Sequence, residues 1–190
     1  MYARYTTPAF ILSSYSEGEA NQIFTCLTPE FGCISVHAQS VRALESKLRF
    51  GMKCFGHPSL EIVRGKGRWR LVGVVPKHFF VSPKFYPLLS RIGNLIERLS
   101  AGEEEKNEML YYDVVHIISL ASEAHLKDRE RDACEMLLVI RILSRMGYWD
   151  STLDTLPRSS AGFSSYCSSL VLSKTDALLK INQTLRATHL

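Results

Sequence analysis

The spacing of apolar residues changes near Pro83, and this change restricts the possible fold more than any other feature of the chain. Before Pro83, short stretches alternate apolar and polar residues, as half-buried strands do. After it, apolar residues recur every three or four positions, which predicts amphipathic helices. We therefore expect an α+β protein with a β domain in residues 1–80 and an α-helical domain in residues 81–190.

Five short strands are predicted in the first domain. They cover residues 9–15, 21–28, 33–38, 59–64 and 68–75. The last two surround Gly65-Lys66-Gly67, a connection typical of a hairpin. Five strands in about eighty residues indicate a five-stranded OB-fold β-barrel.

Four helices are predicted in the second domain. They cover residues 88–99, 109–124, 132–147 and 174–188, with Gly147 as a C-cap. Residues 157–169 are rich in serine and are expected to form a loop or a short ordered excursion.

The positive charge is concentrated in one part of the chain. The formal net charge is only +4, yet residues 39–70 hold eight Lys and Arg against two acidic residues. A localised, single-signed excess favours contact with a polyanion such as nucleic acid, although a solvated surface is the alternative. The candidate phosphate-binding residues are Arg42, Lys47, Arg49, Lys53, Arg64, Lys66, Arg68 and Arg70.

Three aromatic residues lie among these cations and are candidates for stacking on bases: Phe50, Phe55 and Trp69. Within the hairpin, strand parity separates Trp69 from the charged residues, because alternate side chains point to opposite faces. Trp69 is therefore predicted in the core, with Arg68 and Arg70 pointing outward. Phe55 is also expected to be buried.

Catalytic signatures are absent from the sequence. It has no phosphate-binding loop, no nucleophile elbow and no paired histidine metal motif, and His116 is expected to pack in the core. The five cysteines lack short pairings and are predicted to be buried free thiols. We expect no enzyme activity, catalytic residue or cofactor. Without a secretory signal or a bilayer-length apolar run, a cytoplasmic location is expected, and contact of the basic segment with DNA would make the protein nucleoid-associated.

Three segments together resemble the RecO family of recombination-repair mediators. They are "AFILSSYSEGEANQIFTCLTPEFGCISVHAQSVRALESKLR", "VRGKGRWRLVGV" and "LVIRILSRMGYWDSTLDTL". The family's T-x-E-x-G turn is matched by residues 28–32, and its basic loop ends in residues like Lys47-Leu48-Arg49. Its R-x-L-x-x-x-G-Y helix end is matched by residues 141–148.

The resemblance implies a DNA-handling protein. Family members bind single- and double-stranded DNA, anneal complementary strands, and load recombinase together with RecR and single-strand binding protein. The acidic C-terminal tail of single-strand binding protein would then dock on the helical domain, with Arg141 and Arg145 pairing with its carboxylates. Intrahelical pairs with Asp132 or Glu135 explain these two arginines equally well.

The sequence departs from the family pattern in two regions. Many members carry four zinc-binding cysteines after the "GY" helix, whereas this chain has Cys167 alone there, so no zinc is predicted. The loop after the third strand contains Gln39, Ser40, Ala43 and Glu45 where many members are more basic. A protein-interaction adaptor, whose basic barrel docks an acidic partner rather than DNA, therefore remains an alternative.

Overall fold

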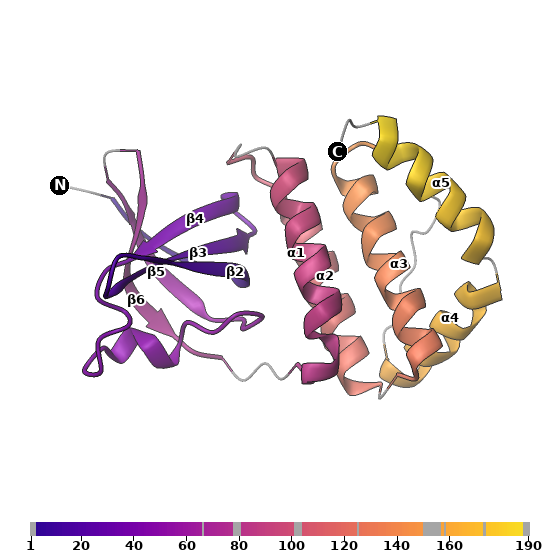
Figure 1. Ribbon diagram of the computed structural model, residues 1–190, viewed down its shortest axis with the longest axis horizontal. Coiled ribbons are helices and arrows are strands. Elements are labelled where there is room, and N and C mark those ends of the chain that lie inside the picture. Colours follow the sequence, from indigo (N-terminus) through magenta and orange to yellow (C-terminus); the bar gives the residue numbers. More distant parts are fainter. Residues whose placement is uncertain are drawn as a thin grey trace.

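The chain folds into an N-terminal sheet followed by a group of helices, and a computed structural model describes residues 3–65, 67–77, 81–100, 104–124, 126–149, 157, 159–172 and 174–187 (Figure 1). The strands are β1 (Arg4–Pro8), β2 (Phe10–Glu17), β3 (Asn21–Thr28), β4 (Gly32–Ala38), β5 (Ser59–Arg64) and β6 (Trp69–Val75). The helices are α1 (Tyr86–Ser100), α2 (Glu108–Glu123), α3 (Asp128–Arg145), α4 (Ser160–Leu172) and α5 (Lys174–Ala187), with short 3₁₀ turns η1 (Lys47–Phe50) and η2 (Pro83–Phe85).

The sheet has six strands in the order β1-β5-β6-β4-β3-β2, so the prediction of a closed five-stranded barrel is corrected in two respects. The additional strand is β1, which the sequence analysis missed because Pro8 ends it after a short, polar stretch. The sheet is open, since among the described strands β1 pairs only with β5 and β2 only with β3. These two edge strands are nevertheless consecutive, separated by Ala9 alone.

The predicted hairpin and its side-chain parity are confirmed. β5 and β6 pair antiparallel, and Trp69 and Leu71 are buried while Arg68 and Arg70 are exposed. The parallel pairing of β6 with β4 places His37 opposite Arg70. This pairing brings the start of β6 beside the end of β4, although about thirty residues separate them in sequence.

The helices begin and end close to their predicted limits, with one correction. α3 ends in a Schellman motif, in which the Tyr148 amide donates to Leu143 and Gly147 has a φ of 80°. Residues 160–169 form most of α4 rather than a loop. Phe163 and Cys167, one helical turn apart, are fully buried and hold this serine-rich segment against α3.

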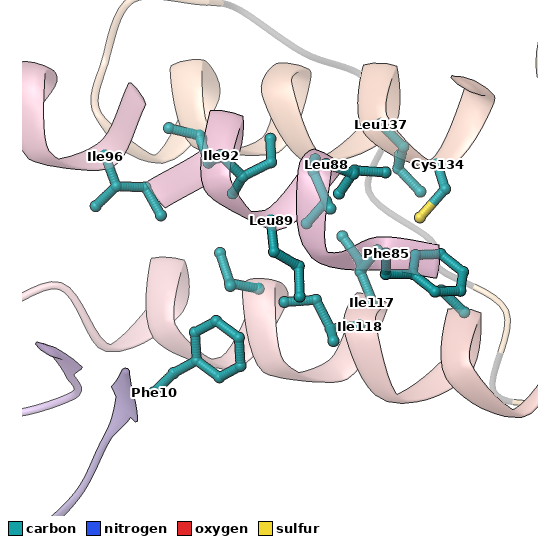
Figure 2. Packing of buried hydrophobic residues seen from close by; sticks show 14 of the residues in the cluster. Phe10, Phe85, Leu88, Leu89, Ile92, Ile96, Ile117, Ile118, Cys134 and Leu137 are labelled. Atoms are coloured by element: carbon teal, nitrogen blue, oxygen red, sulfur yellow. The ribbon is translucent and has the colours of Figure 1, made fainter. Parts of the chain in front are cut away.

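The apolar core is continuous from the sheet into the helices. Phe10, Leu12 and Leu27 on the strands pack in the same cluster as residues of α1, α2 and α3. Figure 2 shows Phe10 pointing toward Leu89 and Ile118. Ile11 on β2 and Phe24 on β3 belong to a second cluster on the other face of the sheet, so residues 10–12 of β2 are buried on both faces.

Within the described ranges, no helix has the length and apolar character required to cross a membrane.

Candidate nucleic-acid interface

The predicted phosphate-binding residues are well placed to meet a ligand in solvent. Seven of the eight lie in the described part of the chain, and all seven are exposed. The eighth, Lys66, lies outside the described residues. The exposed seven are Arg42, Lys47, Arg49, Lys53, Arg64, Arg68 and Arg70.

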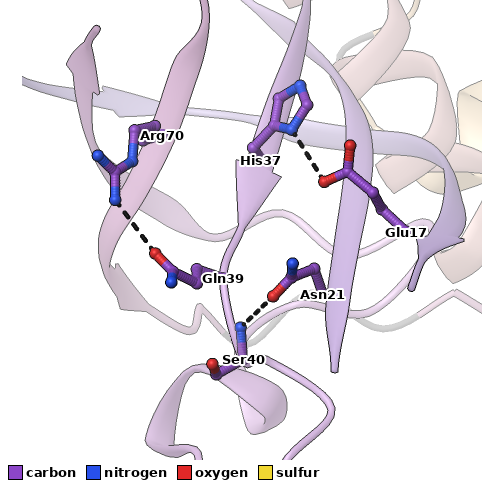
Figure 3. A network of polar contacts seen from close by, with 6 residues as sticks. All are labelled: Glu17, Asn21, His37, Gln39, Ser40 and Arg70. Carbon is purple, nitrogen blue, oxygen red and sulfur yellow. Dashed lines mark hydrogen bonds and ion pairs between the residues drawn. The ribbon is translucent and has the colours of Figure 1, made fainter. Parts of the chain in front are cut away.

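Arg68 and Arg70 border a hollow of about 180 Å³, which we name the hairpin hollow; it is lined by Glu17, Asn21, His37, Ala38, Gln39, Arg68 and Arg70. Arg70 donates to Gln39 Oε1 at 3.1 Å, and His37 Nδ1 lies 3.4 Å from Glu17 (Figure 3). The hollow therefore combines two exposed cations with amide groups and one carboxylate.

A second hollow, of about 390 Å³, lies beneath the loop between β4 and β5, and we name it the loop hollow. It is lined by Gln22, Val41, Arg42, Leu44, Arg49 and Met52. Val41 and Met52 are buried and apolar, and the two arginines are exposed.

Two backbone amides attach the start of the loop between β4 and β5 to the residues at the start of β3. The Ser40 amide donates to Asn21 Oδ1 at 2.9 Å, and the Arg42 amide donates to the Ala20 carbonyl at 3.0 Å. Asn21 lines the hairpin hollow and its neighbour Gln22 lines the loop hollow. Because successive side chains of a strand point to opposite faces, these two residues face different sides of β3.

Arg64 stands apart from the other hairpin cations. It is paired with Trp69 in the β5–β6 register, and its guanidinium lies 5.0 Å from the centre of the indole ring. It also forms a 2.6 Å ion pair with Glu104. A phosphate approaching Arg64 would have to compete with this carboxylate, so Arg64 is a weaker candidate than Arg68 or Arg70.

The three aromatic candidates have different environments. Trp69 is buried in the sheet, as predicted, and contacts Tyr5 and Phe31 edge-on or tilted. Phe55 is partly buried, with its ring centre 5.2 Å from that of Tyr86. Phe50 is 72% exposed, at the end of η1. Of the three, Phe50 has the most surface to offer a base.

The two arginines suggested for partner binding occupy dissimilar sites in α3. Arg145 is partly buried and forms a 2.7 Å ion pair with Asp113 of α2. Arg141 is 4% exposed, and its Nε and Nη2 atoms have no hydrogen-bond partner among the described residues. Arg145 thus pairs with another helix rather than with the intrahelical acids, and Arg141 retains donors that an anion could use.

No group of three or more His, Cys, Asp or Glu residues within the described ranges is positioned to hold a metal ion. Burial raises the pKa of Cys33 to about 11 and of Cys167 to about 12, and it also raises the pKa of Cys26 and Cys134. These four cysteines are therefore thiols, not thiolates, near neutral pH.

Two predicted burial states are wrong. His116 is exposed on α2, because helical spacing places Val114 and Ile117 inward and His116 outward. Cys54 is exposed and lies 3.3 Å from Ser14 Oγ. Cys26, Cys134 and Cys167 are buried free thiols, as predicted, while Cys33 is partly buried.

The polar residues that complete the hairpin hollow, among them Asn21, His37 and Gln39, carry no local sequence signal. Alternation within β4 indicates only that His37 is on the outer face. Its position opposite Arg70 follows from the parallel β4–β6 pairing, which no local pattern predicts.

Fold and site together define a class: an OB-fold-like module with a basic, partly aromatic outer surface, an arrangement typical of binding modules. The comparisons agree with this class. Residues 1–73 match the model of the family described as "Recombination protein O N terminal".

Two curated relatives extend the similarity into the helices. One, the DNA repair protein RecO of Heliobacterium modesticaldum, is 28% identical over 149 residues, covering 76% of this chain and 52% of the relative. The DNA repair protein RecO of Dehalococcoides mccartyi is 25% identical over 147 residues, covering 76% of this chain and 56% of the relative. The chain is therefore similar to RecO proteins, and it spans about half the length of these relatives.

Proposed function

We propose that this protein acts in recombinational DNA repair as a non-catalytic DNA-binding protein. It binds single- and double-stranded DNA through the outer surface of the sheet. The observation that supports this most directly is the exposure of Arg42, Arg49, Arg68 and Arg70 around two hollows of the N-terminal domain. The relatives named DNA repair protein RecO support the biological context.

Strand annealing follows from the electrostatics of such a surface. Two DNA strands repel each other because both are polyanions, and cations that neutralise their phosphates reduce the repulsion. Complementary bases then pair without chemistry by the protein. Recombinase loading with RecR and single-strand binding protein is part of the same proposal, as is action in the cytoplasm at the nucleoid.

A carboxylate-bearing tail of single-strand binding protein is the proposed partner of the helices. The Nε and Nη2 atoms of Arg141 have no hydrogen-bond acceptor among the described residues, which supports binding of an anion near α3. Arg145 is the second candidate for this contact. Arg145 already pairs with Asp113, so the incoming carboxylate would have to compete with that group. Binding of the tail peptide to the wild type and to an Arg141→Met variant would test this assignment.

The DNA proposal is tested by neutralising the hairpin cations. The double variant Arg68→Gln/Arg70→Gln should bind a single-stranded oligonucleotide more weakly, and by a similar factor for different sequences, since phosphate contacts do not read bases. The matched control is Arg98→Gln/Arg129→Gln, which removes two exposed cations from the helices. Equal weakening by both pairs would reduce the effect to net charge and contradict the proposed interface.

The adaptor alternative predicts a different outcome. An acidic partner docking on the same cations would make the Arg68→Gln/Arg70→Gln variant lose protein binding while the wild type shows no affinity for oligonucleotides.

A further inference from the structure

The loop between β4 and β5 carries an unusual combination of charge and exposed apolar surface. Leu44 is 87% exposed and Phe50 is 72% exposed. The cations Arg42, Lys47, Arg49 and Lys53 share this short segment with a single acid, Glu45. Exposed apolar side chains between cations match a ligand that is anionic along its backbone and apolar on its flat faces.

The loop hollow has the composition of a site for one such flat group. Val41, Met52 and Leu44 are its apolar lining residues, and the rest of its lining is polar. Arg42 and Arg49 border it and are exposed, and Arg42 Nη1 donates to the Gly18 carbonyl at 3.4 Å. Both guanidinium groups can therefore be reached by the phosphates that flank an inserted group. Its volume of about 390 Å³ falls within the range of small-molecule sites.

Gln22 supplies a polar group at the same hollow. Its Nε2 donates to Ser14 Oγ at 3.0 Å, which fixes the orientation of the side-chain amide. The opposite end of that amide, Oε1, is an acceptor suited to an N–H group on the edge of a nucleobase.

Resting on the proposed function, we infer that the loop hollow receives an unpaired base of single-stranded DNA and that Phe50 stacks on a neighbouring base. A base in a duplex is stacked on both faces and paired along one edge, so it cannot enter the hollow without leaving the double helix. The loop therefore confers preference for single strands, whereas the hairpin cations bind either form through phosphates.

The test separates base contacts from phosphate contacts. A 20-nucleotide oligothymidylate is compared with an oligonucleotide of equal length in which every position is abasic, so that the number of phosphates is unchanged. The wild type should bind the intact strand more tightly. Phe50→Ala should weaken binding of the intact strand by at least about fivefold, from the contribution of one stacked base. Binding of the abasic strand should be nearly unaffected.

Leu44→Ala should have the same selective effect, and both changes affect exposed side chains, so the fold should tolerate them. The matched control is Tyr112→Ala, which removes an aromatic ring, 57% exposed, from α2. This control should leave both affinities unchanged.

Four results would overturn the inference. Equal wild-type affinity for the two oligonucleotides would show that bases are not contacted, while the proposed DNA binding would stand. Parallel weakening of both oligonucleotides by Phe50→Ala would assign Phe50 a role other than stacking. Binding to phosphatidylserine vesicles that requires Phe50, with oligonucleotide affinity unchanged, would assign the loop to a lipid surface. Absence of binding to either oligonucleotide would contradict both the inference and the proposed function.

Discussion

At the scale of single residues, Gly32 connects the sheet to the segment before α2. It has a φ of 64°, a conformation that side chains disfavour, and a Cβ at this position would overlap the carbonyl oxygen of Glu105. Both the turn and the close approach of two backbones therefore require glycine. The turn was predictable from "PEFG", but the approach of Glu105 was not, since it depends on the packing of distant segments.

Replacing Gly32 by alanine should destabilise the protein by at least about 2 kcal/mol, because backbone strain and steric overlap add. Gly18→Ala is the matched control: Gly18 has a φ of 66°, but a Cβ at this position would have no described atom within 4 Å, so only the strain, about 1 kcal/mol, remains. Urea unfolding measures the difference. Equal losses for the two variants would show that Glu105 can move away without cost.

At the scale of secondary-structure elements, α4 shows how composition obscured a helix. Serines dominate residues 157–169, which favours a loop, since serine competes for backbone hydrogen bonds. The overlooked signal was the spacing of Phe163, Cys167 and Leu170, an apolar stripe at helical periodicity. The other four helices were predictable because their apolar stripes are longer and their flanking residues more ordinary.

Phe163→Ala should lower the free energy of unfolding by about 3–5 kcal/mol, because Phe163 is fully buried and its removal leaves a cavity between α4 and its neighbours. Ser165→Ala, on the exposed face of the same helix, should change stability by less than about 0.5 kcal/mol. A small loss for Phe163→Ala would mean that α4 contributes little to the core.

At the scale of the whole molecule, the sequence predicts two domains whereas the core is continuous. The change of periodicity near Pro83 correctly located the transition from strands to helices. It gave no indication that Phe10, Leu12 and Leu27 would pack among the helices. Apolar runs such as "AFIL" indicate burial on both faces, but the identity of the covering element is a tertiary property.

If the shared core couples the two halves, they should unfold in a single transition. The two tryptophans allow a direct measurement: a Trp149→Phe variant leaves Trp69, buried in the sheet, as the fluorescence reporter. Its thermal transition should coincide with the loss of helical circular dichroism. Separate transitions would instead establish independent domains at residues 1–80 and 81–190.

The central claim is that exposed cations on the sheet bind the DNA backbone, and the salt dependence of binding tests it most directly. The logarithm of the association constant for single-stranded DNA should fall linearly with the logarithm of salt concentration, by about 0.7 for each phosphate contact. Arg68→Gln/Arg70→Gln should reduce that slope by about 1.4, the equivalent of two contacts. A salt-independent affinity, or an unchanged slope in this variant, would contradict the account.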